Sequence, residues 1–172
     1  MIEVYDNFLD NTLFLQLKDN IESYKFPWYK NKIVLDSEYV GPEHNNIQMD
    51  HVFFKQNSYK SKYISLILPL LNKFNNEKLI RVKSNLTFYK QRINNWHIDI
   101  NVPGTTGIFY VNTNDGGTHF QHDGTKIESK ENRMVMFPSN LIHSGYSCTN
   151  SEHRIVINFN WLDDPSSNLF KR

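Results

Sequence analysis

The sequence predicts an α+β fold in which N-terminal helices precede short strands that form a two-sheet sandwich or jelly roll. The first observation is a change in the spacing of apolar residues near Leu79, from helical intervals to short strand-like runs. The second is that strong turn signals separate the later runs, at Asn114–Gly117 and at Asp123–Gly124. Helices followed by many short strands are typical of α+β domains, and such strands form two packed sheets.

The N-terminal part of the chain predicts a short strand and two helices. Residues 2–9 have the pattern of an extended lead-in, and Asp10 can cap a helix that runs to about Tyr24. One face of that helix would carry the apolar side chains of Leu13, Phe14, Leu17 and Ile21. Helical spacing returns between residues 58 and 74. Residues 26–56 are irregular and contain several turn signals, a pattern that favours either a substrate loop or a disordered excursion.

The second part of the chain supplies the strands. We expect them near residues 80–90, 96–101, 106–112, 117–121, 133–137, 142–147 and 153–161. A chain of 172 residues fits one domain, over residues 1–172. In this prediction, residues 1–78 form a helical flank with an irregular substrate-side segment, and residues 79–162 form the jelly-roll core.

Charge and cysteine content exclude several classes of protein. A net charge of +1 gives no electrostatic reason to expect nucleic-acid binding, which usually requires a basic face. The single cysteine, Cys148, excludes an intramolecular disulfide and a thiolate cluster, so histidine and carboxylate remain as the metal ligands. The most apolar stretch, residues 64–71, is too short to span a membrane, and residues 1–4 do not begin a signal peptide. We therefore expect a soluble, cytoplasmic protein.

A metal site is predicted by His97, Asp99 and His143. Two side chains separated by one residue in an extended segment point to the same face, so His97 and Asp99 could both contact one ion. His143, after a run of strand-like segments, would complete a three-sided site with open coordination positions. Such a site suits non-haem Fe(II), which needs vacant positions for a co-substrate and O2. His-x-Asp alone also occurs by chance as a hydrogen-bonded surface pair, so the ordered combination with His143 and Arg154 carries the prediction.

This combination resembles the Fe(II)- and 2-oxoglutarate-dependent oxygenases, in particular their small prolyl-4-hydroxylase-like branch. The resemblance covers roughly residues 80–162 and is strongest at Trp96-His97-Ile98-Asp99, Gly116-Gly117-Thr118, Phe137-Pro138 to His143, and Arg154 to Trp161. It implies a double-stranded β-helix (a cupin-like jelly roll) with flanking N-terminal helices. It further implies that His97, Asp99 and His143 bind Fe(II), that Arg154 pairs with the distal carboxylate of 2-oxoglutarate, and that O2 is consumed. The implied activity is a dioxygenase that hydroxylates a protein, peptide or small-molecule substrate and releases succinate and CO2.

The sequence departs from this family at two positions near the co-substrate. Many relatives have a hydroxyl residue two positions after the basic residue, where this chain has Val156, so another group must help to hold the carboxylate. Prolyl hydroxylases proper commonly have lysine in place of Arg154, so the pattern does not indicate proline as the substrate. Candidates for further co-substrate contacts share faces of the two strands that flank the motif. They are Tyr89 and Asn85 before it and Asn158 after it.

Other readings remain open at this point. His119, His122 and Asp123 form a rival cluster, but they straddle a predicted turn, where polar side chains are usually solvated. A jelly roll can also be a non-catalytic, cupin- or lectin-like metal-binding module, which would be favoured by a fourth ligand such as His119. A third reading is a nucleic-acid demethylase of the same family, against which the near-neutral charge argues.

Overall fold

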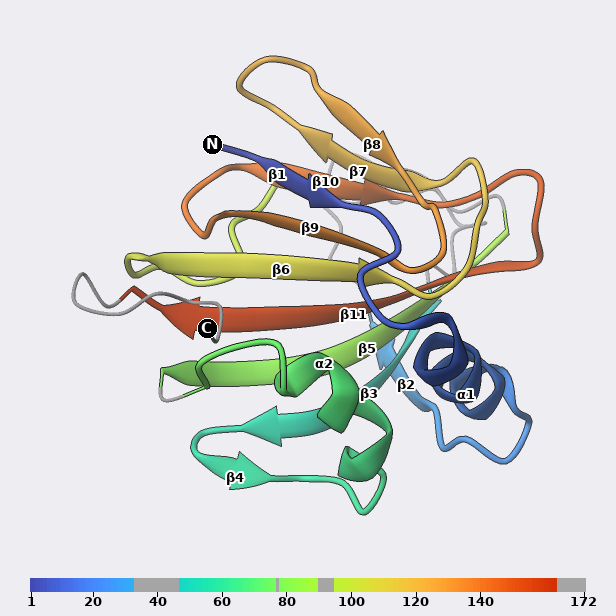
Figure 1. Ribbon diagram of the computed structural model, residues 1–172. Helices are drawn as coiled ribbons and strands as arrows, with labels where there is room; N and C mark the ends of the chain where they lie inside the picture. The colour runs from blue at the N-terminus through green and yellow to red at the C-terminus, as the bar shows by residue number, and fades with distance from the viewer. Residues whose placement is uncertain (33–46, 77, 90–94, 164–172) are drawn as a thin grey trace.

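Two antiparallel sheets form the protein (Figure 1), for which a computed structural model describes residues 1–32, 47–76, 78–89 and 95–163. The large sheet has the strand order β1 (Glu3–Tyr5), β9 (Arg133–Pro138), β6 (Gly104–Tyr110), β11 (His153–Leu162), β5 (Leu79–Phe88), β3 (Ile47–Lys55) and β2 (Tyr29–Lys32), with β4 (Ser58–Tyr59) paired to β3. The small sheet has the order β10 (His143–Tyr146), β7 (Gly117–Phe120) and β8 (Lys126–Glu128). This architecture is a jelly roll, the double-stranded β-helix, as the sequence predicts.

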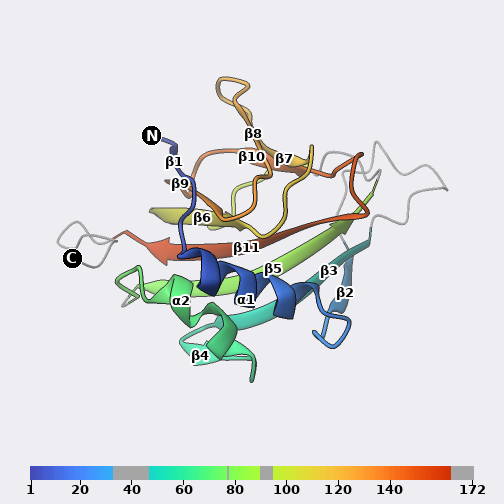
Figure 2. The same ribbon diagram turned by 45° about the vertical axis from the view of Figure 1, so that its right-hand side comes forward.

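The helices lie on the side of the large sheet that faces away from the small sheet (Figure 2). Helix α1 (Asn11–Glu22) begins where expected, because the side chain of Asp10 accepts a hydrogen bond of 2.9 Å from the backbone N–H of Thr12. Its buried residues are Phe14, Leu17 and Ile21, whereas Leu13 is exposed. No helix in the described part of the chain is long and apolar enough to cross a membrane.

The predicted second helix over residues 58–74 is wrong. Ser58–Tyr59 is strand β4, and helical structure is confined to a 3₁₀ turn over Ile64–Ile67 and the single-turn helix α2 (Leu68–Leu71). Pro69 gives the physical reason. It lacks a backbone N–H and is tolerated only in the first turn of a helix, so α2 begins beside it instead of continuing an earlier helix.

The strand predictions need three corrections. The segment over residues 26–56 is not wholly irregular, because it supplies β2 and β3. Strand β3 pairs with β5 from Gln48↔Thr87 to Lys55↔Arg81. Residues 33–46 lie outside the described part. The predicted strand over residues 96–101 is absent, and His97 makes only an isolated bridge to His143. Strand β8 was not predicted. The sheets therefore also contain strands from residues 1–78, which the sequence assigned to the helical flank.

The two faces of β11 explain where the site lies. Ile155, Ile157, Phe159 and Trp161 belong to the core on the helix side, together with Phe14 and Phe109. The alternate residues of the strand are directed toward the small sheet, because successive side chains point to opposite faces. Val156 joins a smaller core there with Ile108 and Phe137. The remaining inward residues, Arg154, Asn158 and Asn160, are polar; the first two line a cavity between the two sheets, and Asn160 donates a hydrogen bond to Thr106.

Candidate functional site

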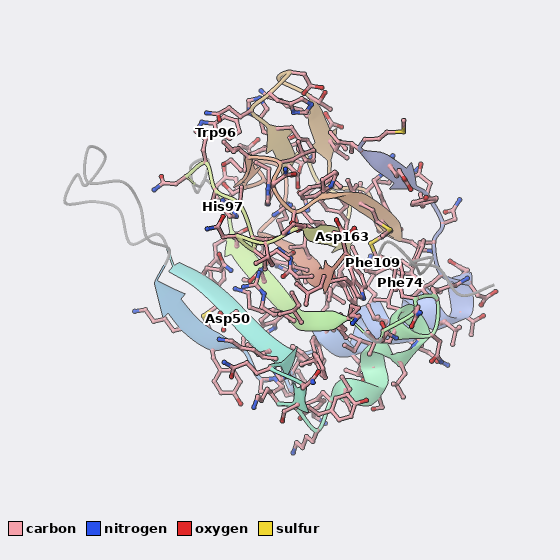
Figure 3. The ribbon with its side chains drawn as sticks, turned by 90° about the vertical axis from the view of Figure 1, so that its left-hand side faces the viewer. Asp50, Phe74, Trp96, His97, Phe109 and Asp163 are labelled. Atoms are coloured by element: carbon pink, nitrogen blue, oxygen red, sulfur yellow. The ribbon has the colours of Figure 1, made fainter. Side chains whose placement is uncertain are left out.

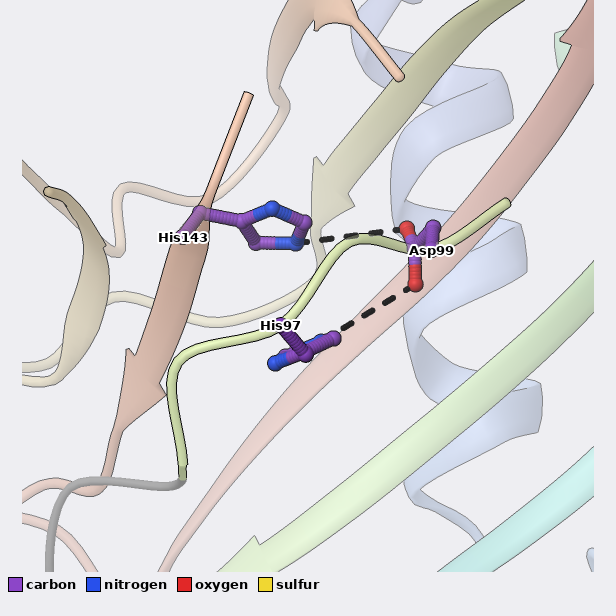
Figure 4. A group of neighbouring side chains, drawn as sticks. All are labelled: His97, Asp99 and His143. Carbon is purple, nitrogen blue, oxygen red and sulfur yellow. Dashed lines mark ion pairs between the residues drawn. The ribbon is translucent and has the colours of Figure 1, made fainter. Parts of the chain in front are cut away.

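His97, Asp99 and His143 come together at one end of this cavity (Figure 4). Reciprocal backbone hydrogen bonds of 3.0 Å join His97 and His143. Nε2 of His97 lies 4.0 Å from Oδ1 of Asp99, and Nε2 of His143 lies 4.0 Å from Oδ2. One ligand atom from each residue lies within 4.8 Å of the others. This spacing allows one ion to contact all three residues from one side.

Backbone carbonyl groups orient both imidazole rings. Nδ1 of His97 lies 2.8 Å from the carbonyl oxygen of Asn95, and Nδ1 of His143 lies 3.0 Å from that of Leu141. A carbonyl can only accept, so each Nδ1 donates to it, and Nε2 is the ring nitrogen that remains available to a metal on the side of Asp99. These hydrogen bonds favour the tautomer with its proton on Nδ1, which is the one that binds a metal through Nε2.

Asp99 is fixed by two side chains from neighbouring strands. Arg81 on β5 donates from Nη2 to Oδ1 at 3.2 Å, and Asn160 on β11 donates from Nδ2 to Oδ2 at 3.3 Å. Arg81 and Asn160 are also joined by a hydrogen bond of 2.9 Å. Burial acts to raise the pKa of Asp99, but the neighbouring His143 and Arg81 outweigh it and hold that pKa below its usual range. Asp99 is therefore ready to bind a cation as a carboxylate.

The two histidines differ in exposure. The side chain of His143 is 3% exposed and packs edge-on against the ring of Phe137, with centroids 4.8 Å apart. Burial lowers the pKa of His143, which favours the neutral, ligating form of the ring. The side chain of His97 is 45% exposed and lies beside Trp96 on the segment that leads into the site (Figure 3). The His97–Asp99–His143 cluster is therefore buried on the side of His143 and open on the side of His97.

Arg154, the second residue of β11, lies in the same cavity of about 350 Å³. Arg154 is 5% exposed, its Nε donates to Oγ of Ser129 at 2.9 Å, and its guanidinium carbon lies 5.4 Å from the ring centroid of Tyr110. No carboxylate in the described ranges forms an ion pair with it. Burial lowers the pKa of Arg154, so the protein bears a desolvation cost to keep this cation there. A Cβ at Gly116 would approach Cδ of Arg154 to 2.9 Å, which explains the need for glycine at that position.

The predicted co-substrate residues are placed differently from one another. Asn85 and Asn158 line the cavity, as does Val156, which has no hydroxyl group. Tyr89 lies just beyond β5, is 46% exposed and is not part of the cavity lining. A co-substrate contact from Tyr89 therefore stays a prediction.

Thr87 is a residue that the sequence analysis missed. It lies opposite Arg154 in the pairing of β5 with β11, it lines the cavity, and its buried Oγ1 has no hydrogen-bond partner among the described residues. Oδ1 of Asn158 is buried and without a described partner in the same way. The alternation of β5 places Thr87 on the face of Asn85, but only the strand register shows that it neighbours Arg154.

The rival cluster does not form a metal site. His122 pairs with the exposed Asp123 at 3.2 Å, and Oδ1 of Asp123 accepts a hydrogen bond from the backbone of Thr125 that closes the turn. His119 instead packs against Trp96, with ring centroids 4.9 Å apart. Within the described ranges, His97, Asp99 and His143 form the only group of at least three His, Cys, Asp or Glu residues suitable for a metal. The fourth ligand that a closed, structural site would need is not supplied by His119.

Comparisons with known proteins agree with this fold. The sequence matches no protein-family model, and it matches no curated protein. Among solved structures, the chain is similar to the viral collagen prolyl hydroxylase of Paramecium Bursaria Chlorella virus-1 in its 2OG complex, with a TM-score of 0.56, 17% identity, and coverage of 92% of this chain and 94% of that one. It is also similar to a Trichoplax adhaerens prolyl hydroxylase in complex with a hypoxia-inducible factor peptide fragment, with a TM-score of 0.61, 16% identity, and coverage of 97% and 87%.

A third similar structure is a 2OG-Fe(II) oxygenase family oxidoreductase from Burkholderia pseudomallei, with a TM-score of 0.63, 8% identity, and coverage of 86% and 78%. The chain has the fold of the 2-oxoglutarate- and Fe(II)-dependent oxygenases. At these identities the likeness concerns the fold, and the chemistry must be argued from the residues of the site itself.

Proposed function

We propose that this protein is an Fe(II)- and 2-oxoglutarate-dependent dioxygenase that hydroxylates a small-molecule or polypeptide substrate, with succinate and CO2 as co-products. The observation that carries the proposal is one cavity that contains both an open His-Asp-His site and a buried arginine without a described carboxylate partner. The first feature suits Fe(II), and the second suits the distal carboxylate of a 2-oxo diacid.

The residues of the cavity fit both groups. Two neutral imidazoles and one carboxylate occupy one side of a metal and leave the other positions for a chelating 2-oxo acid and O2. The buried Oγ1 of Thr87 and Oδ1 of Asn158 have no described partners, and buried polar atoms normally have one. A polar co-substrate that extends from the metal site toward Arg154 would supply partners for them.

Each residue then has a distinct task. His97, Asp99 and His143 would hold the iron, which together with O2 supplies the oxidising chemistry. Arg154 would hold the distal carboxylate of 2-oxoglutarate through two parallel hydrogen bonds and so fix its orientation. Thr87, opposite Arg154, offers the hydroxyl group that is missing at Val156. The walls of the cavity would exclude water and place the substrate C–H bond on the open side, near His97.

The test is conversion of 2-oxoglutarate to succinate, followed by mass spectrometry, with purified protein, Fe(II) and O2. With a broad panel of candidate substrates to supply the C–H bond, we expect succinate to form only when protein, Fe(II) and O2 are all present and to be lost in His143→Ala. His153→Ala, at a partly exposed position on β11 outside the cavity lining, is the matched control and should retain the conversion. Iron-loaded, folded protein that forms no succinate with any substrate of a broad panel, and does not bind 2-oxoglutarate, would overturn the proposal.

A further inference from the structure

The large sheet continues past the co-substrate strand, and its next two strands carry a charged pair beside the cavity. Lys83 on β5 lies opposite Asn158 of β11 and lines the cavity. Its Nζ forms an ion pair with Oδ2 of Asp50 on β3, at 3.6 Å. The two side chains are 18% and 16% exposed. Figure 3 shows Asp50 on β3, beyond β5. This pair is not used by the metal site or by Arg154.

The Lys83–Asp50 contact is loose for a pair so little exposed. A charge-assisted hydrogen bond between nitrogen and a carboxylate usually measures about 2.7–2.9 Å, whereas this one measures 3.6 Å. Burial, and next the charge of Arg81, lower the pKa of Lys83, and Asp50 only partly opposes them. The neighbouring amides satisfy each other, because Gln48 donates to Oδ1 of Asn85. Among the cations that line this side of the cavity, Lys83 would therefore be stabilised most by a further hydrogen-bond acceptor.

The charge balance of the site points the same way. The doubly positive iron and the doubly negative co-substrate of the proposed function cancel each other. Among the described residues, the cavity has three cations, Arg81, Lys83 and Arg154. Asp99 and Asp50 balance two of them. The described lining, with iron and co-substrate bound, therefore keeps a net charge of +1, which one negative charge on the substrate would balance.

We propose that the primary substrate carries a carboxylate group and that Lys83 binds it. This inference rests on the proposed function and names its substrate class. One residual charge fits a carboxylate better than a phosphate, which brings a charge of about −1.5 to −2. Lys83 and Arg81 are two residues apart on one strand face, so their Cα atoms are separated by about 6.7 Å, and Arg81 contacts Asp99. The oxidised carbon is thus a few bonds from the carboxylate.

The reaction balances for this class. A C–H bond of the substrate is replaced by C–O–H, with one oxygen atom taken from O2. The other oxygen atom enters succinate, as 2-oxoglutarate is oxidised and loses CO2. The carboxylate on Lys83 is not consumed and serves to place the C–H bond. Two sources offer this chemistry, namely a free amino or organic acid and a carboxylate of a peptide.

The experiment compares matched acids and amides. Anaerobic protein with Fe(II) and 2-oxoglutarate is titrated with free amino acids and short organic acids in one arm, and with short peptides bearing a free or an amidated carboxylate in the other. Binding is measured by the change in the metal-to-co-substrate charge-transfer band and by calorimetry. We expect at least one acid to bind about 10- to 100-fold more tightly than its own amide. The arm that contains this acid identifies the source.

Variants at the pair give opposite expectations. Lys83→Met should remove the preference for the acid, whereas Asp50→Asn should tighten binding of the acid several-fold, because it releases Lys83. The affinity for 2-oxoglutarate is measured alongside in both variants, and the exposed Lys55→Met on β3 is the control. Because damage to the fold weakens binding in every variant, the opposite signs distinguish a binding role from a structural one.

The outcomes separate the two proposals. If the band forms but every acid and its amide bind equally, or none binds, the carboxylate inference fails and the dioxygenase proposal stands. The inference also fails if Lys83→Met retains the preference for the acid. If the band never forms with iron-loaded protein, both proposals are overturned.

Discussion

Replacing Arg154 by methionine should weaken binding of 2-oxoglutarate by about two to three orders of magnitude. Arg154 is 5% exposed, so the interaction of its guanidinium with a carboxylate is little screened by water. Truncating one partner of a buried, hydrogen-bonded charge pair costs about 2–5 kcal/mol. Two charge-assisted hydrogen bonds of about 1.5–3 kcal/mol each give a similar range. A loss of about 3–4 kcal/mol corresponds to roughly 150- to 1000-fold in Kd.

The assay is an anaerobic titration of Fe(II)-loaded protein with 2-oxoglutarate, followed by the charge-transfer band. Methionine has a similar length and leaves the metal ligands in place, so the affinity for iron should not change. Arg154→Lys retains the charge but loses the planar fork, and it should be affected less. Arg133→Met is the control, because Arg133 binds Asp6 at 2.6 Å at the surface. An affinity of Arg154→Met within threefold of the unchanged protein would refute the reasoning.

Three further predictions concern stability and metal binding. Burial lowers the pKa of His51 below 6.5, so the unfolded chain takes up a proton that the folded chain refuses as the pH falls through 6.5. The free energy of unfolding in urea should fall from there down to the lowered pKa, and His51→Gln should remove this part of the pH dependence. Gly117→Ala should cost about 1–3 kcal/mol, because its Cβ would lie 2.2 Å from a backbone oxygen of β8. Gly124→Ala, which meets only backbone strain at φ +73°, should cost less in the same denaturation assay. Asn160→Ala removes a hydrogen bond that holds Asp99 and should weaken Fe(II) binding about 10- to 100-fold in a metal titration; unchanged affinity would contradict this role.

The clustering of His97, Asp99 and His143 was predictable in part because the first two are close in sequence. His97 and Asp99 are separated by one residue, so their side chains lie close together even though the segment is not a strand. His143 and Arg154 could be assigned to two successive strands from the turn signals and apolar runs around them. Helix α1 was predictable for the same reason, since its cap and apolar stripe lie within one segment.

The rest depended on tertiary context. Strand β3 escaped prediction because its inward residues, Gln48 and Asp50, are polar, and His51 interrupts its outward apolar face. The core tolerates His51, since its Nδ1 lies 2.7 Å from the carbonyl oxygen of Pro27 and its Nε2 lies 2.7 Å from Oγ of Ser61. Local sequence patterns do not determine which residues of two strands lie opposite each other. The pairing of Thr87 with Arg154, and the proximity of Lys83 to Asp50, could therefore be read only from the structure.

The most direct test of the central claim is the visible spectrum of the anaerobic protein with Fe(II) and 2-oxoglutarate. Chelation of a 2-oxo acid to Fe(II) gives a weak charge-transfer band that neither component shows alone. We predict this band in the unchanged protein and its loss in His97→Ala and Asp99→Ala. Its absence from folded, iron-loaded protein, or its persistence in both variants, would contradict the assignment of this cavity to iron and 2-oxoglutarate.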